Sequence, residues 1–99
     1  MNFSIIKEAG ISVSDFARIA NVSRVTVSLW VNGKILPHRL HIKKINQLLV
    51  SIEKALDAQM LPIPKGLEAS VRLRRIKEAI IAQANNVKSD NQDEDDNEE

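Results

Sequence analysis

Two short segments with helical spacing of apolar residues lie only three residues apart, and no other feature constrains the fold of this chain as much. The first covers residues 13–20 and follows Ser12, whose hydroxyl can accept a hydrogen bond from a free amide of a first helical turn. Its apolar side chains share one side of a helix: Val13, Phe16, Ala17, Ile19 and Ala20. Asn21 follows, and asparagine adopts left-handed backbone geometry at low cost. We therefore predict a short helix that ends in a sharp turn.

The second segment covers residues 24–32, with Ser23 as its N-cap and Gly33 at its end. One side of this helix carries Thr26, Val27, Trp30 and Val31, and the other carries Arg24, Val25, Ser28, Leu29 and Asn32. The first side, together with Val22, offers apolar contacts to the preceding helix. We therefore expect the second side to remain free.

Helical periodicity recurs through the rest of the chain, and no stretch alternates strictly enough to predict a strand. A helix over residues 3–9 has Asn2 as a suitable cap. A longer helix over residues 37–57 has Pro37 in its first turn. Its core-facing stripe consists of Ile42, Ile45, Leu48, Leu49, Ile52 and Leu56. We expect an all-α fold in which residues 1–60 form a four-helix domain.

The remaining residues divide into a linker, a helix and a tail. Residues 61–66 contain two prolines and a glycine, so they form a non-helical linker. Residues 67–87 are helical again, with one apolar stripe made of Ala69, Leu73, Ile76, Ile80 and Ala84. A second apolar patch on this helix consists of Leu67, Val71 and Ile81. Residues 88–99, rich in Asp, Glu and Asn, are expected to be a disordered acidic tail.

The charges of the chain are segregated, so its net charge of +1 is misleading. Seven of the 13 acids lie in residues 89–99, which hold no base, and the other 88 residues carry six acids against 14 bases. The net charge of +8 on residues 1–88 suits a polyanionic partner. The absence of Cys excludes disulfides and thiolate metal sites. No apolar run is long enough for a membrane span, and we expect no secretory leader.

The string from Val22 to Lys34, VSRVTVSLWVNGK, resembles the recognition helix and the Asn-Gly exit of the lambda-repressor and Cro-like helix-turn-helix proteins, the Xre family. A second match to that family is the spacing of Ala17, Asn21, Val27 and Trp30. The resemblance covers residues 3–57 and implies a lambda-repressor-like DNA-binding domain. Asn21 stands where Gly is commonest in the family. Val13 stands where the family often has a DNA-contacting Gln, so that contact is not carried over.

The resemblance assigns base reading in the DNA major groove to the free face of residues 24–32, namely to Arg24, Val25, Ser28 and Leu29. Arg24 has the fork geometry for guanine O6 and N7, and Ser28 can hydrogen-bond to several bases. Val25 and Leu29 can pack against thymine methyl groups. A solvated charge at Arg24 and a protein interface at Leu29 are the alternatives. Trp30 points inward, so we interpret it as a core residue rather than a base-stacking platform.

Further residues are expected to contact the DNA backbone. The candidate phosphate-binding residues are Ser12, Ser14, Ser23, Asn32, Lys34, His38 and Arg39. His38 and His41 stand three residues apart, which is a possible metal-ligand spacing. With no Cys and no clustered acids nearby, we expect a structural or phosphate-facing role for them, and neither a metal nor a cofactor.

The helix over residues 67–87 is a candidate dimerisation element. Members of the family usually bind as dimers that place two recognition helices in major grooves about 34 Å apart. Two apolar surfaces are more than one contact requires, so one can dock on the domain and the other on a second chain. We assign dimerisation to the stripe of Ala69, Leu73, Ile76, Ile80 and Ala84. A helix that only closes its own domain is the alternative.

These features predict a sequence-specific regulator that binds double-stranded DNA, as a homodimeric repressor of the phage or mobile-element kind on a palindromic operator. Such a protein acts in the bacterial cytoplasm and associates with the nucleoid. The alternative is an antitoxin-like module that binds a protein partner, and DNA only secondarily. No nucleophile–base pair, carboxylate pair or Gly-rich phosphate loop stands out, so we expect neither an enzyme nor a small-molecule substrate nor a membrane partner.

Overall fold

The computed structural model describes the backbone of residues 1–95 and the side chains of residues 1–84. In that part of the chain there are five α-helices and no strand: α1 (Ser4–Glu8), α2 (Val13–Ala20), α3 (Arg24–Val31), α4 (Arg39–Asp57) and α5 (Ala69–Asp95). The expected all-α fold, with a four-helix N-terminal part and one further helix, is confirmed.

The turn between α2 and α3 has the geometry that the sequence predicts. Asn21 adopts left-handed backbone angles of φ 61° and ψ 47°, and its N–H points back to the carbonyl oxygens of Ala17 and Arg18. The Ser12 hydroxyl accepts a hydrogen bond from the Asp15 N–H at 3.0 Å and so caps α2. The Ser23 hydroxyl accepts one from the Thr26 N–H at 3.1 Å and caps α3. Each helix therefore begins beside its own serine.

The expected start of α4 at Pro37 is wrong by two residues. His38 is the N-cap, because its Nδ1 accepts a hydrogen bond from the Leu40 N–H at 3.1 Å. Pro37 is buried in the connection before the helix. Asn2 Oδ1 accepts a hydrogen bond from the Ser4 N–H at 3.1 Å, and α1 begins at that serine rather than at Phe3.

The core joins side chains from all five helices. Its largest fully buried members are Phe16, Val27, Ile45, Ile52 and Ile76. Trp30 is buried as predicted and stacks on Phe3, with ring centroids 5.8 Å apart. Two predicted inward-facing residues, Val31 and Ile42, are instead 40% and 41% exposed. Val31 is the last residue of α3, and Ile42 lies in the first turn of α4.

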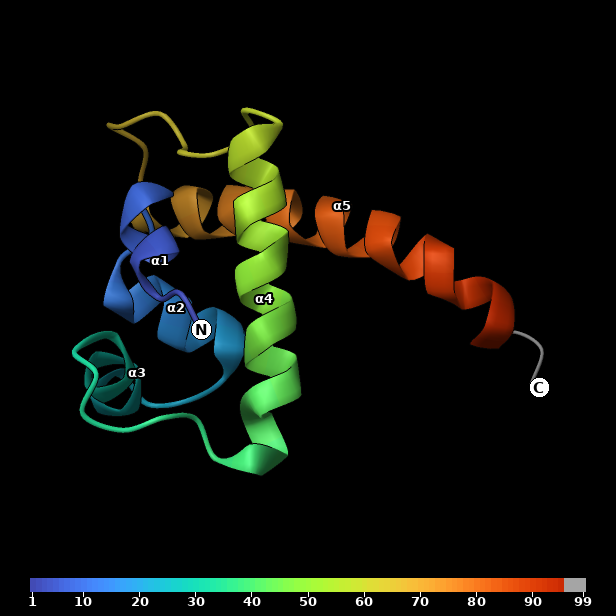
Figure 1. Cartoon of the computed structure of the whole chain (residues 1–99). Coiled ribbons are helices and arrows are strands. Elements are labelled where there is room, and N and C mark those ends of the chain that lie inside the picture. Colours follow the sequence, from blue (N-terminus) through green and yellow to red (C-terminus); the bar gives the residue numbers. More distant parts are fainter. Residues whose placement is uncertain (96–99) are drawn as a thin grey trace.

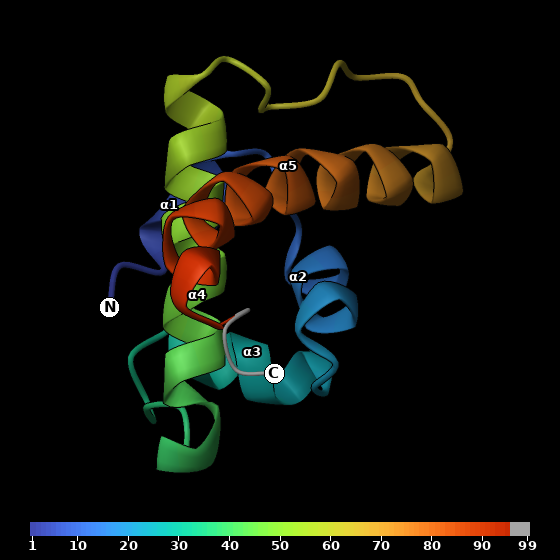
Figure 2. The same ribbon diagram turned by 90° about the vertical axis from the view of Figure 1, so that its right-hand side faces the viewer.

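Helix α5 packs across the C-terminal half of α4, at the end of the domain opposite α3, as both ribbon views show (Figure 1, Figure 2). Ile76 and Ile80 are 1% and 4% exposed and belong to the domain core, so their assignment to a dimer interface is wrong in this structure. Ala69 is exposed, whereas Leu73 and Ala84 are half-buried. A part for these three in dimerisation stays a prediction.

The linker also belongs to this packing. Leu61 is 3% exposed, and the Pro62 side chain lies so close to Gly10 that a Cβ placed there would be 3.1 Å from it. Gly10 has a φ of +71°, which favours glycine as well. Residues 61–66 thus hold α5 against the domain rather than separate it.

The helical backbone of α5 extends to Asp95, beyond the expected end near residue 87. The expected acidic tail over residues 88–99 therefore starts within α5, and residues 96–99 lie outside the described part of the chain. Disorder of the tail stays a prediction.

If α5 is part of the core, Ile76→Ala will lower the free energy of unfolding by about 2–5 kcal/mol, because it leaves a cavity under α5. Ile42→Ala is the matched control, since it removes the same atoms from an exposed helical site, and it should change stability by no more than about 0.5 kcal/mol. Urea unfolding followed by circular dichroism measures both. Equal, small effects would mean that α5 does not pack on α4.

Candidate nucleic-acid interface

The outer face of α3 brings together the four residues predicted to read bases. Arg24, Val25, Ser28 and Leu29 line one open hollow of about 440 Å³. Arg24 is exposed and Val25 is 68% exposed, while Ser28 and Leu29 are half-buried at the base of the hollow. Charged, polar and apolar groups thus converge on one surface that no other described residue lines.

The inner face of α3 holds this surface in place. Val27 is fully buried, and Trp30 is buried in the same core cluster. Lys44 of α4 donates a hydrogen bond from Nζ to the Ala20 carbonyl oxygen at 3.0 Å. A cation at the carbonyl end of a helix is favourable, and here it ties α4 to the last turn of α2. The position of α3 is therefore set by α2, α4 and the N-terminal segment together.

Three of the predicted phosphate-binding side chains are helix caps. Ser12 and His38 cap α2 and α4, and Ser23 caps α3 while its O–H donates to the Thr26 Oγ1 at 2.8 Å. The Ser23 hydroxyl must therefore give up that bond to donate to a phosphate. Ser12 keeps a free O–H for this purpose.

The other phosphate candidates fall into two groups. Asn32, Lys34 and Arg39 are exposed in or beside the connection between α3 and α4. The Asn32 Nδ2 lies 3.4 Å from the Ser28 Oγ, so this side chain leans back toward the base-reading face. Ser14 is half-buried near the start of α2, where the neighbouring Asp15 lies 3.7 Å from the Arg72 guanidinium. Asn32 and Lys34 thus directly follow α3 and Arg39 begins α4, and the contacts of all three with phosphate stay a prediction.

The charge around α3 has one sign over a long stretch of chain. No Asp or Glu occurs between Asp15 and Glu53, whereas this interval contains six Lys and Arg residues and both histidines. It spans most of α2, all of α3, the connection to α4 and more than half of α4. Such a one-sided field attracts polyanions and raises the rate at which they associate.

The two histidines lie at the start of α4. Their ring centroids lie 6.4 Å apart, and the His38 Nδ1 is already the cap of α4. Among the described residues, no group of three His, Cys, Asp or Glu side chains comes together to hold a metal ion. The same part of the chain contains no helix long and apolar enough to cross a membrane.

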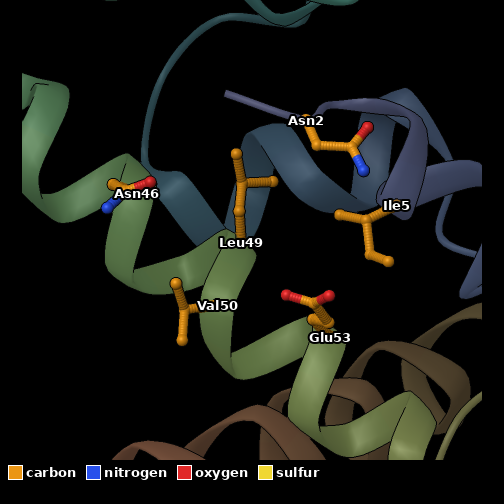
Figure 3. Close-up of a pocket in the computed structure, with 6 residues that line it drawn as sticks. All are labelled: Asn2, Ile5, Asn46, Leu49, Val50 and Glu53. Atoms are coloured by element: carbon orange, nitrogen blue, oxygen red, sulfur yellow. The ribbon is translucent and has the colours of Figure 1, made fainter.

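A small pocket lies between α1 and α4. Asn2 and Ile5 face α4 across it (Figure 3), and its full lining is Asn2, Ile5, Asn46, Leu49, Val50 and Glu53. Its volume of about 150 Å³ is small, because ligand pockets usually measure about 300–1,000 Å³. We therefore assign no ligand to it.

A comparison with known families identifies this arrangement. The helix-turn-helix family profile matches residues 4–57, which is more than half of the chain. The chain belongs to the Xre, lambda-repressor-like family of helix-turn-helix proteins. It is therefore a DNA-binding transcription regulator of that type. The searches of curated proteins and of solved structures found no match.

Two contacts that hold elements of the fold together were not foreseen from the sequence. Lys44 reaches Ala20 across 24 residues of chain, and Arg72 donates a hydrogen bond to the Gly10 carbonyl oxygen at 2.7 Å. In the sequence, Lys44 and Arg72 look no different from the other basic residues near them. Their partners are backbone carbonyl groups, which have no signature in a sequence.

Asn21 offers a test of the turn that orients α3. With a φ of 61°, Asn21→Ala should be less stable than Asn21→Gly by about 1 kcal/mol, because alanine resists left-handed geometry. The control is Asn46, an exposed position inside α4, where alanine should instead be the more stable by about 1 kcal/mol. Urea denaturation measures all four variants. The same order of Ala and Gly at both positions would contradict the observed turn.

Proposed function

We propose that the protein recognises a specific double-stranded DNA sequence by inserting α3 into the major groove. The observation that carries this proposal is the convergence of Arg24, Val25, Ser28 and Leu29 on one uncovered hollow of α3. A major groove is about 12 Å wide and admits one α-helix, and the outer face of α3 has no competing partner among the described residues.

The four side chains supply complementary means of reading bases. Arg24 stands in the first turn of α3, where its guanidinium can donate two parallel hydrogen bonds to guanine O6 and N7. Ser28 can donate or accept, which suits several bases. Val25 and Leu29 discriminate thymine by apolar contact with its methyl group. Specificity therefore rests on one charged side chain, Arg24, and on the uncharged side chains of Val25, Ser28 and Leu29.

Backbone contacts supply most of the affinity. The acid-free stretch between Asp15 and Glu53 faces DNA with Arg24, Lys34 and Arg39 exposed. Each phosphate neutralised releases a counterion, so binding weakens steeply as salt is added. Ser12 and Asn32 then fix the register of the domain on the duplex.

A homodimer would make the site long enough to be selective. Ile76 and Ile80 are used inside the domain, so the surface left for a second copy is the other apolar patch, with Val71 and Ile81 on α5 and Leu67 just before it. Ile81 is 55% exposed and is the most exposed large apolar residue described on α5. Two copies related by a twofold axis would read a palindromic operator.

A dimer that covers its operator blocks access to that DNA, so we propose repression as the outcome. A repressor of the phage or mobile-element kind, acting on DNA in the bacterial cytoplasm, fits this role. An antitoxin-like partner protein would instead bind α5. That alternative would gain support if no DNA site were enriched and an unrelated protein bound to α5.

Selection of bound duplexes from a random pool tests the proposal, with Arg24→Ala as the informative variant. The wild type should enrich a site with guanine opposite Arg24, and the variant should lose about 1–3 kcal/mol of discrimination there. Lys65→Ala removes one exposed charge from the linker and is the control, with the wild-type site expected. A pool without any enriched sequence would refute specific DNA recognition.

Ile81→Asp tests the dimer. A carboxylate in an apolar subunit contact is costly to bury, so the variant should be monomeric by analytical ultracentrifugation at concentrations where the wild type is dimeric. Its selected DNA should contain one half-site instead of two. Ile42→Asp, at an exposed helical site outside this patch, is the matched control for the sedimentation measurement alone, because it also adds an acid to the stretch proposed to face DNA. A wild-type protein that stays monomeric on DNA would refute the homodimer.

A further inference from the structure

Two leucines beside α3 are more exposed than any other large apolar side chain in the described part of the chain. Leu36 is 74% exposed and Leu40 is 79% exposed, and Ile35 next to them is 46% exposed. Leu36 lies in the connection between α3 and α4, and Leu40 lies in the first turn of α4. Neither leucine belongs to the core cluster of the described residues or packs against it. Exposed apolar surface of this kind is unfavourable in water and indicates an interaction site.

The backbone that carries the two leucines is restricted in its motion. Pro37, directly after Leu36, is buried and limits the backbone on both sides of the peptide bond that it forms. The N–H of Leu40 is held by the Nδ1 of His38 at 3.1 Å. A partner can therefore bind the two side chains with little loss of conformational freedom.

Charge decides which partner fits this surface. Lys34, Arg39 and Lys43 are close to the leucines in the chain, all three are exposed, and the nearest acids along the chain are Asp15 and Glu53. A second copy of the same surface would bring like charges together. A polyanion that also offers apolar atoms avoids that cost, and the sugars and base edges of a DNA groove are such a partner.

The position of the leucines agrees with this choice. The connection and the start of α4 lie at the same end of the molecule as α3, and α5 lies at the opposite end (Figure 1, Figure 2). Leu36 and Ile35 share a hollow of about 530 Å³ with Thr26 and Trp30 of α3. Leu36 therefore adjoins α3 on the side that carries Thr26 and Trp30, and Leu40 follows in the first turn of α4.

We propose that Leu36 and Leu40 form an apolar wedge that contacts the minor groove next to the major groove occupied by α3, and that this contact bends the duplex. The inference rests on the proposed function. Leucine side chains pressed against base steps open them, while flanking cations neutralise the phosphates that the bend brings closer. Lys34 and Arg39 supply those cations. The bend makes sequence at the wedge matter through DNA flexibility, without hydrogen bonds to bases.

The test uses the full chain and the duplex that the wild type selects from a random pool, labelled at its two ends with a fluorophore pair. Three proteins are compared with the wild type: Leu36→Ala/Leu40→Ala, Leu36→Met/Leu40→Met and Val50→Ala. The alanine pair should bind at least about tenfold more weakly and should shorten the end-to-end distance much less. The methionine pair keeps the apolar volume and should retain both the affinity and the bend.

Val50 is an exposed aliphatic residue in the middle of α4, and its alanine variant controls for general loss of surface apolar area. All variants are compared by thermal unfolding and ultracentrifugation before DNA is added. The wedge is overturned if the alanine pair binds and bends DNA like the wild type, or loses affinity without losing the bend. It is also overturned if the wild type self-associates without DNA and the alanine pair does not, because the leucines then face a second copy. A wild type that selects no DNA would refute the proposed function itself, which is a separate result.

Discussion

Burial of one face of α3 is the constraint on which the rest of the molecule depends. Val27 has no exposed surface, and Trp30 is stacked on Phe3 from the start of the chain. Because these side chains point inward, the helical period directs Arg24, Val25 and Ser28 outward. The left-handed turn at Asn21 and the bond from Lys44 to Ala20 then fix the direction of the helix. A rigid α3 is what allows a few side chains to meet defined base edges.

The two ends of the molecule differ in charge and in packing. At the α3 end, no acid interrupts the chain between Asp15 and Glu53, and apolar leucines remain uncovered. At the α5 end, an additional helix closes the core through Ile76 and Ile80, and Arg72 ties it to the Gly10 carbonyl. The α5 end thereby stabilises the domain without lining the hollow on the outer face of α3. This separation leaves the outer patch of α5 available for contacts between copies.

Local signals predicted the helix-turn-helix almost completely. Ser12, Asn21 and Ser23 act on neighbouring amides, so their effect is visible within four residues of sequence. The face of α3 followed from helical periodicity, which also placed Val27 and Trp30 inside. What the sequence did not predict depends on contacts between distant segments. Two apolar stripes on α5 look equivalent in sequence, and only packing on α4 shows that the one with Ile76 and Ile80 is internal. The exposure of Leu36 and Leu40 was likewise hidden, because nothing local shows that no helix covers them.

In the proposed mechanism, DNA meets the α3 end of the molecule and not the α5 end. Amide chemical shifts of the ¹⁵N-labelled protein, recorded during titration with its selected duplex, test this most directly. The account predicts the largest changes in α3 and in the connection to the start of α4, with small changes from Ile76 to Ile80 in the core-facing part of α5. Large shifts confined to α5, with the amides of α3 unmoved, would contradict it.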